Sequence, residues 1–316
     1  MNNLFKISTM QIQVRLLIGA LLLCFSLQNC QDSTRPKADS SQQETPPNLP
    51  AADGNYWFQG KAEIARYKVE QERYGEMRSA QQIMVFVTED FSASKQVKLD
   101  DPAAAGADRV PVLKVNLLRR FVTGIYDYSL MLSVFTPFDQ QQPKPSLKVT
   151  TTVQDWCGHV FQQYNRTDSS FMAQTFSYFE TEGDQKEEVK ADILEDEIWT
   201  LLRLNPAVFA DRKATVVPSS IFLRLRHKKL AAENARFTLR KEDNASSLRL
   251  DFEKTDRHLD IRFETAFPHR ILGWEETVDT KLVSRGTLEN ISMQQYWSEH
   301  DNQHEPLRKQ IGLEWF

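Results

Sequence analysis

Cysteine is scarce in this chain of 316 residues, and the three that occur are Cys24, Cys30 and Cys157. The first two lie at the N-terminus, where the sequence predicts removal of one and lipidation of the other. Only Cys157 then remains, so we expect no intramolecular disulfide in the folded part. Its stability must come from a hydrophobic core, which a chain of this length can build.

Two further absences narrow the function. The chain holds 39 Lys and Arg against 43 Asp and Glu, a formal net charge of −4, and it has no extended block of Lys or Arg. This balance argues against a nucleic-acid partner. A glycine-rich phosphate loop, a G-x-S-x-G elbow and an H-E-x-x-H zinc motif are also absent, so no familiar enzyme motif is present.

Residues 1–29 contain Lys6 and Arg15, lack Asp and Glu, and include the apolar run LLIGALLLCFSL at residues 16–27. This run is shorter than the roughly 20 residues that cross a bilayer comfortably. Because Cys30 follows at once, the pattern is typical of a bacterial lipoprotein signal peptide over residues 1–29, with Cys30 as the lipidated residue. The alternative is a simple secretory leader or an N-terminal anchor helix. Either way, the folded part is exported.

The lipid would attach the protein to a membrane of the cell envelope, and the outer membrane is the favoured location. The sequence leaves open whether the domain faces the periplasm or the outside. Residues 30–54 are rich in Ser, Gln, Pro and Asp and almost free of large apolar side chains, which predicts a disordered tether. Fully extended, such a tether reaches roughly 70–80 Å.

Residues 55–316 are predicted to form a single β-rich domain. Apolar and charged residues alternate along several segments, for example at residues 220–226 (SIFLRLR) and 248–252 (LRLDF). Such strands bury one face and expose the other, as in antiparallel sheets. A break at Thr123-Gly124 predicts a hairpin turn between two further strands. We therefore expect a mainly β fold with a large curved antiparallel sheet or half-open barrel.

One segment has helical rather than strand spacing. Within residues 191–204 (ADILEDEIWTLLRL), apolar residues recur at 194, 198, 201 and 202, and Pro206 follows. The sequence therefore predicts one main helix that packs on the sheet. Its residues Ile198, Trp199, Leu201 and Leu202 are expected to form the lid of an apolar groove. That groove could hold a lipid or an acyl chain.

The stretch TTVQDWCGHVFQQYN at residues 151–165 contains the main chemical candidates. If it is one strand, Asp155, Cys157 and His159 share a face. They would then lie about 6.6–6.8 Å apart, which is too far for a direct thiol–imidazole hydrogen bond without leaning. A thiol-dependent or metal-dependent enzyme centred on these three residues is the alternative reading. A structural role for a buried Cys157 is the favoured one, and we predict no metal and no other cofactor.

Longer phrases such as YWFQGKAEIARYKVEQERYGE (residues 56–76), VPVLKVNLLRRFVTGIYDYSLMLSVFTP (residues 110–137) and QDWCGHVFQQYN (residues 154–165) resemble a family of Bacteroidota lipoproteins. Some members carry the label septum formation inhibitor Maf. The Ser-x-Ser-Pro-Arg-Arg motif of the Maf pyrophosphatases is absent here, so that activity is not expected. On architecture alone, the chain is also similar to the lipoprotein carriers of the Lol system, open antiparallel barrels with a helical lid.

These observations predict a lipid-anchored, non-enzymatic protein of the cell envelope. It would bind a lipid or lipoprotein acyl chain in a groove, or serve as a docking module for an envelope protein. Its partners would be the membrane, through the lipid on Cys30, and such a ligand or protein.

Overall fold

The computed structural model describes residues 56–313. The predicted signal peptide, the lipidation site Cys30 and the tether lie outside the described residues. Within the described range, no helix has both the length and the apolar character needed to cross a membrane.

Strands dominate the described chain. The strands are β1 (Ala62–Arg73), β2 (Glu76–Ser92), β3 (Arg109–Thr123), β4 (Tyr126–Pro137), β5 (Lys148–Gln154), β6 (His159–Arg166), β7 (Phe171–Ser177), β8 (Gln185–Val189), β9 (Ile193–Leu194), β10 (Lys213–Val217), β11 (Glu233–Arg240), β12 (Ala245–Phe252), β13 (Arg257–Glu264), β14 (Ile271–Val278) and β15 (Lys281–Gln294). The helices are α3 (Ile198–Leu204), α4 (Ser220–Leu225) and α5 (Glu305–Gln310), with 3-10 turns η1 (Gly106–Asp108), η2 (Glu195–Glu197), η3 (Pro206–Phe209) and η4 (Asn302–His304).

The strands form one 15-stranded sheet in the order β8-β7-β6-β5-β4-β3-β2-β1-β15-β14-β13-β12-β11-β10-β9. The chain starts in the middle at β1 and runs outward strand by strand to β8. It then crosses to the other edge at β9 and returns strand by strand to β15, which pairs with β1. Every pair is antiparallel except β9 with β10. The predicted antiparallel sheet is confirmed.

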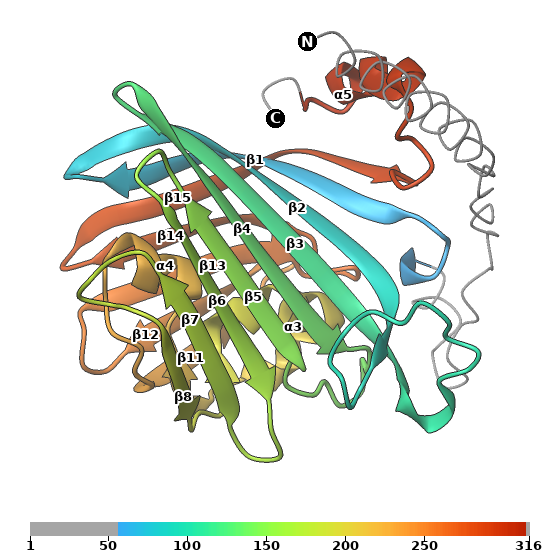
Figure 1. Ribbon diagram of the computed structural model, residues 1–316, viewed down its shortest axis with the longest axis horizontal. Helices are drawn as coiled ribbons and strands as arrows, with labels where there is room; N and C mark the ends of the chain where they lie inside the picture. Colours follow the sequence, from blue (N-terminus) through green and yellow to red (C-terminus); the bar gives the residue numbers. More distant parts are fainter. Residues whose placement is uncertain (1–55, 314–316) are drawn as a thin grey trace, which may run out of the picture. The chain divides into compact units, whose positions relative to one another are not determined.

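The sheet is strongly curved but not closed. Its two edge strands, β8 and β9, are joined only by residues 190–192. A link of this length spans at most about 15 Å between Val189 and Ile193, so the two edges must approach each other although they do not pair. Helices α3 and α4 lie on the inner side, between the strands from β3 to β7 and those from β11 to β14 (Figure 1).

The main hydrophobic core fills this inner side. It combines inward-facing residues of both halves of the sheet with residues of α3 and α4. Alternation predicted several strands correctly, and β12 is the clearest case because its buried and half-buried residues alternate without interruption. The predicted turn at Thr123-Gly124 is also confirmed, since Gly124 has a positive φ of 61° between β3 and β4.

The prediction of a strand at residues 220–226 is wrong, because this segment forms helix α4. Ile221 and Leu225 are four residues apart and both enter the core, a spacing that fits a helix as well as a strand. The helix is favoured by carboxylates from a distant part of the chain. Glu195 accepts a hydrogen bond from the Ser219 amide at 2.9 Å, and Asp196 accepts one from the Ser220 amide at 3.0 Å.

The main helix was predicted over residues 191–204, but α3 begins at Ile198. The preceding residues form the short strand β9 and the 3-10 turn η2. Asp192, near the start of the predicted helix, pairs with β10. Its carboxylate accepts a hydrogen bond from the Thr215 amide at 2.7 Å, and its own amide donates to the Thr215 carbonyl at 2.8 Å.

Candidate functional site

Asp155, Cys157 and His159 do not form a row on one strand. Residues 155–158 are the turn between β5 and β6. One carboxylate oxygen of Asp155 accepts hydrogen bonds from the amides of Cys157 at 2.6 Å and Gly158 at 3.2 Å. Aspartate commonly stabilises turns in this way. Cys157 is a free, exposed thiol rather than the buried side chain we favoured, and His159 is an exposed residue at the start of β6.

The β5–β6 turn belongs to a row of four neighbouring hairpin turns at one end of the sheet, the end that also has the β12–β13 and β14–β15 turns. Strand register places the turns after β1, β3, β5 and β7 side by side, on the left of Figure 1. We call residues 74–76, 123–127, 154–159 and 177–185 together the hairpin-tip surface. Large exposed apolar side chains gather on it: Tyr74, Ile125, Trp156 and Tyr178. Ile125 is 85% exposed, Trp156 70% and Tyr74 58%.

Several contacts hold these tips in place. Trp156 donates its indole N–H to Asp127 at 3.0 Å, which links the second and third hairpins. Tyr126 donates to the Tyr74 hydroxyl at 2.9 Å, which links the first and second. The ring of Tyr178 lies so close to Gly158 that a Cβ there would be 2.4 Å from it. The hairpin turns that carry the exposed aromatic side chains are therefore joined to one another by side-chain contacts.

The hairpin-tip surface is also acidic. Its four segments contain no Lys or Arg, and its acidic residues are Glu76, Asp127, Asp155, Glu180, Glu182 and Asp184. Glu182 is neutralised by Arg224 of α4 at 2.7 Å. The surface thus combines apolar side chains with an excess of negative charge.

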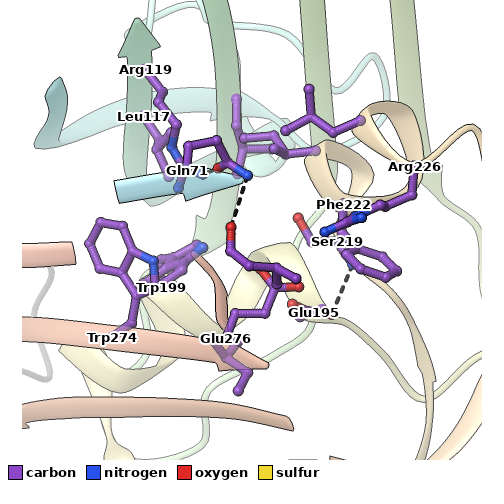
Figure 2. A pocket seen from close by; sticks show the side chains of 15 residues that line it. Gln71, Leu117, Arg119, Glu195, Trp199, Ser219, Phe222, Arg226, Trp274 and Glu276 are labelled. Atoms are coloured by element: carbon purple, nitrogen blue, oxygen red, sulfur yellow. Dashed lines mark hydrogen bonds between the residues drawn. The ribbon is translucent and has the colours of Figure 1, made fainter. Parts of the chain in front are cut away.

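A second candidate lies on the inner side of the sheet. A cavity of about 40 Å³ is bounded by the central strands, by η2 and α3, and by the start of α4. Figure 2 shows Arg119 and Gln71 above this cavity and Glu195 and Glu276 below it, with Trp199 and Trp274 at one side. The partly exposed residues Ser219, Phe222 and Arg226 line it as well.

The carboxylates of the cavity are held by one arginine. Arg257 donates from both terminal nitrogens to Glu195, at 2.6 and 2.7 Å, and from Nε to Glu276 at 2.7 Å. Its guanidinium carbon lies 4.0 Å from the centre of the Phe222 ring. Burial lowers the pKa of Arg257, but the two carboxylates outweigh that effect and raise it above the usual range.

The predicted lid residues Ile198, Trp199, Leu201 and Leu202 are all buried. Trp199 lines the cavity and meets Trp274 edge to face, with ring centres 5.6 Å apart. The other three pack within the core. Helix α3 therefore occupies the inner side of the sheet, where the apolar groove was expected.

Sequence reasoning missed the burial of the three acids of η2. Glu195 is paired with Arg257, whereas Asp196 and Glu197 form no ion pair within residues 56–313. Burial raises the pKa of Asp196 to about 6, against opposing hydrogen bonds from Ser220 and Ser219. It likewise raises the pKa of Glu197 to about 7. Acidic residues before a helix are ordinarily solvent-exposed, so no local signal distinguished these.

Another cavity, of about 210 Å³, lies next to η3. Lys241, Phe263 and His269 are among its lining residues. Across residues 56–313, no three His, Cys, Asp or Glu side chains are placed so that they could bind one metal ion together.

Comparisons with known proteins add no relative. A scan against protein-family models matches none of them, and searches of the curated proteins and of the solved structures return no significant match. The resemblance to Bacteroidota lipoproteins therefore stays a prediction.

Proposed function

We propose that this protein is a lipid-anchored, non-enzymatic docking module of the cell envelope, attached through Cys30. The observation that carries the docking role is the hairpin-tip surface. Large apolar side chains that are left exposed together commonly mark a contact surface. Tyrosine and tryptophan are also enriched in the centres of protein interfaces.

The placement of the inner residues favours docking over the carriage of an acyl chain. A pocket for a lipid-sized ligand typically measures roughly 300–1,000 Å³, and the cavity that Trp199 lines measures about 40 Å³. Ile198, Leu201 and Leu202 pack against core residues of the same chain. The apolar surface that remains available is therefore on the outside.

The partner we infer is a protein with an apolar patch bordered by basic residues. The tips carry carboxylates and no Lys or Arg, so a basic partner gains favourable charge contacts. The same charge disfavours an anionic membrane surface, which attracts basic segments. The enzyme alternative at Asp155, Cys157 and His159 has less support, because Asp155 accepts hydrogen bonds from backbone amides of its own turn.

Site-specific photocrosslinking of the full-length chain in the cells that produce it tests the docking role. A photoreactive amino acid is placed at Trp156 or at Ile125. The control position is Val97, which is also exposed but lies in the β2–β3 connection at the other end of the strands. We expect one crosslinked protein from both tip positions and none from Val97, with crosslinked peptides rich in Lys or Arg.

Each other outcome contradicts the proposal. Crosslinks to lipid alone would make the tips a membrane-contact surface, and crosslinks to a second copy of this chain would make them a self-association surface. Equal products from Val97 and the tips, or no product at all, would remove the basis for docking there. The anchor is tested separately: labelled fatty acid should be incorporated into the wild-type chain and not into Cys30→Ser.

A further inference from the structure

Four arginines are buried in the described chain, and Arg119 differs from the other three, since Arg203, Arg224 and Arg257 each form an ion pair. Arg203 binds Glu63 through two hydrogen bonds of 2.6 and 2.7 Å, and Arg257 binds Glu195 in the same way. Arg119 of β3 is buried as well but forms no ion pair within residues 56–313. A buried guanidinium without a carboxylate partner is costly, so the surroundings of Arg119 require an explanation.

Both hydrogen-bond partners of Arg119 are neutral. Its Nε donates to the side-chain oxygen of Gln82 at 2.7 Å, and its Nη1 donates to that of Gln71 at 2.5 Å. Its guanidinium carbon lies 5.6 Å from the centre of the Trp274 ring. A guanidinium has five N–H groups, and Nη2 makes no hydrogen bond to the described chain. Arg119, which lines the 40 Å³ cavity, therefore has N–H groups available to donate further hydrogen bonds.

An acceptor is left at the same cavity. Glu276 uses one carboxylate oxygen to accept from Arg257, and its other oxygen has no hydrogen-bond partner among residues 56–313. Glu276 acts on Arg119 at longer range: burial lowers the pKa of Arg119 to about 10, and the charge of Glu276 offsets part of this effect. The cavity is thus lined by a positively charged hydrogen-bond donor, Arg119, and a negatively charged acceptor, Glu276, each with an unused hydrogen-bonding group.

We propose that this cavity binds a small α-amino acid as its zwitterion. The ligand's carboxylate would accept hydrogen bonds from Arg119, and its ammonium group would donate to Glu276. An anion would be attracted by Arg119 and repelled by Glu276, and a cation would be attracted by Glu276 and repelled by Arg119. This site is independent of the docking role proposed above, since it lies on the inner side of the sheet.

The size of the cavity limits the ligand. A buried water needs roughly 10–15 Å³ of such space, so about 40 Å³ corresponds to about three water molecules, close to glycine or alanine in volume. Ser219, Phe222 and Arg226 are partly exposed and form the side of the cavity from which a ligand would enter. Larger side chains would meet Trp199 and Trp274.

Isothermal titration calorimetry with the full-length chain in mild detergent tests this proposal. Glycine is compared with acetate and methylamine, which each carry one of its two charged groups, and with inorganic phosphate. Because each charge-assisted hydrogen bond contributes a factor of roughly ten or more in affinity, we expect glycine to bind at least about tenfold tighter than acetate or methylamine. Phosphate binding tighter than glycine, or no binding by glycine, would overturn the proposal.

Variants separate recognition from structure. Arg119→Gln should abolish glycine binding without lowering the melting temperature, because it removes a buried charge that lacks an ion-pair partner. Glu276→Gln should reduce the affinity for glycine to that for acetate. Arg262→Gln changes an exposed arginine of β13 and should leave glycine binding unchanged. If Arg119→Gln lowers the melting temperature and glycine binds Glu276→Gln as well as wild type, Arg119 is structural only.

Discussion

The ion pair between Glu63 of β1 and Arg203 of α3 is predicted to dominate the attachment of the helix to the sheet. Both side chains are fully buried, and two hydrogen bonds of 2.6 and 2.7 Å join them. Tyr56 also donates to Glu63, and Arg203 donates from Nε to the Pro268 carbonyl at 2.8 Å. Glu63→Gln removes the negative charge with little change in shape. It leaves the guanidinium buried without a charged partner.

Removing one partner of a buried ion pair costs about 3–5 kcal/mol of unfolding free energy, because the remaining charge is desolvated and uncompensated. We therefore expect Glu63→Gln to lower the unfolding free energy by that amount. Arg203→Met should cost a similar amount by leaving Glu63 charged. In the double variant neither charge remains, so its loss should be smaller than the sum of the two single losses by about 2 kcal/mol or more.

Urea unfolding followed by far-ultraviolet circular dichroism measures these differences, with midpoints converted by linear extrapolation. The matched control is Glu275→Gln. Its carboxylate contacts Arg285 at 2.7 Å, but both side chains are about half exposed, so the expected loss is below about 1 kcal/mol. The reasoning is refuted if Glu63→Gln costs no more than Glu275→Gln, or if the two single losses add within about 0.5 kcal/mol.

The pH dependence of this pair has a definite sign. Burial raises the pKa of Glu63, but the charge and hydrogen bonds of Arg203 outweigh burial, so its pKa in the folded protein lies below the usual value. The unfolded chain then binds more protons at acidic pH. The stabilisation by this pair is complete above the unfolded pKa of about 4.5 and is lost as the pH falls through the folded value.

Other residues give separate predictions. Glu197 has its pKa raised to about 7, so the folded state holds a proton that the unfolded chain releases near pH 4.5. Its contribution, on the order of 3 kcal/mol, is present below pH 4.5 and lost as the pH rises through about 7; Glu197→Gln should remove this dependence in urea titrations at several pH values. Asp155→Ala should lower the unfolding free energy by about 1 kcal/mol, because the amides in the β5–β6 turn lose their acceptor. The exposed Cys157→Ala should change it by less than about 0.5 kcal/mol in the same assay.

The strands were predictable where burial follows the local pattern alone. Leu248 and Leu250 of β12 alternate with Arg249 and Asp251, and the strand forms as expected. Leu223 and Leu225 alternate with arginine in the same way but belong to a helix. The difference is that Asp196, far away in the sequence, accepts hydrogen bonds from the start of α4. Alternation over six residues contains no information about such a partner.

The turn at residues 155–158 illustrates a different limit. Asp155 and Gly158 are common turn residues, and that signal was available in the sequence. The row of Asp155, Cys157 and His159 was considered only on the condition that residues 151–165 form one strand, and the turn does not meet that condition. For the cavity, the relevant residues could not be grouped in advance. Arg119, Glu195 and Glu276 belong to β3, η2 and β14, and only the folding of the sheet around the helices brings them together.

The segment from β9 to α3 explains why an apolar interior contains so many charges. It begins at the edge strand β9 and forms the crossover to β10, which lies inside, where its backbone groups need partners. Glu195 reaches Arg257 of β13, Glu197 accepts hydrogen bonds from the amides of Leu194 and Ser146, and Arg203 reaches Glu63 of β1. These contacts fix the segment to both halves of the sheet and keep α3 within the core. With its inner side occupied in this way, the sheet still exposes large apolar side chains on its hairpin tips, and it is there that we propose a partner binds.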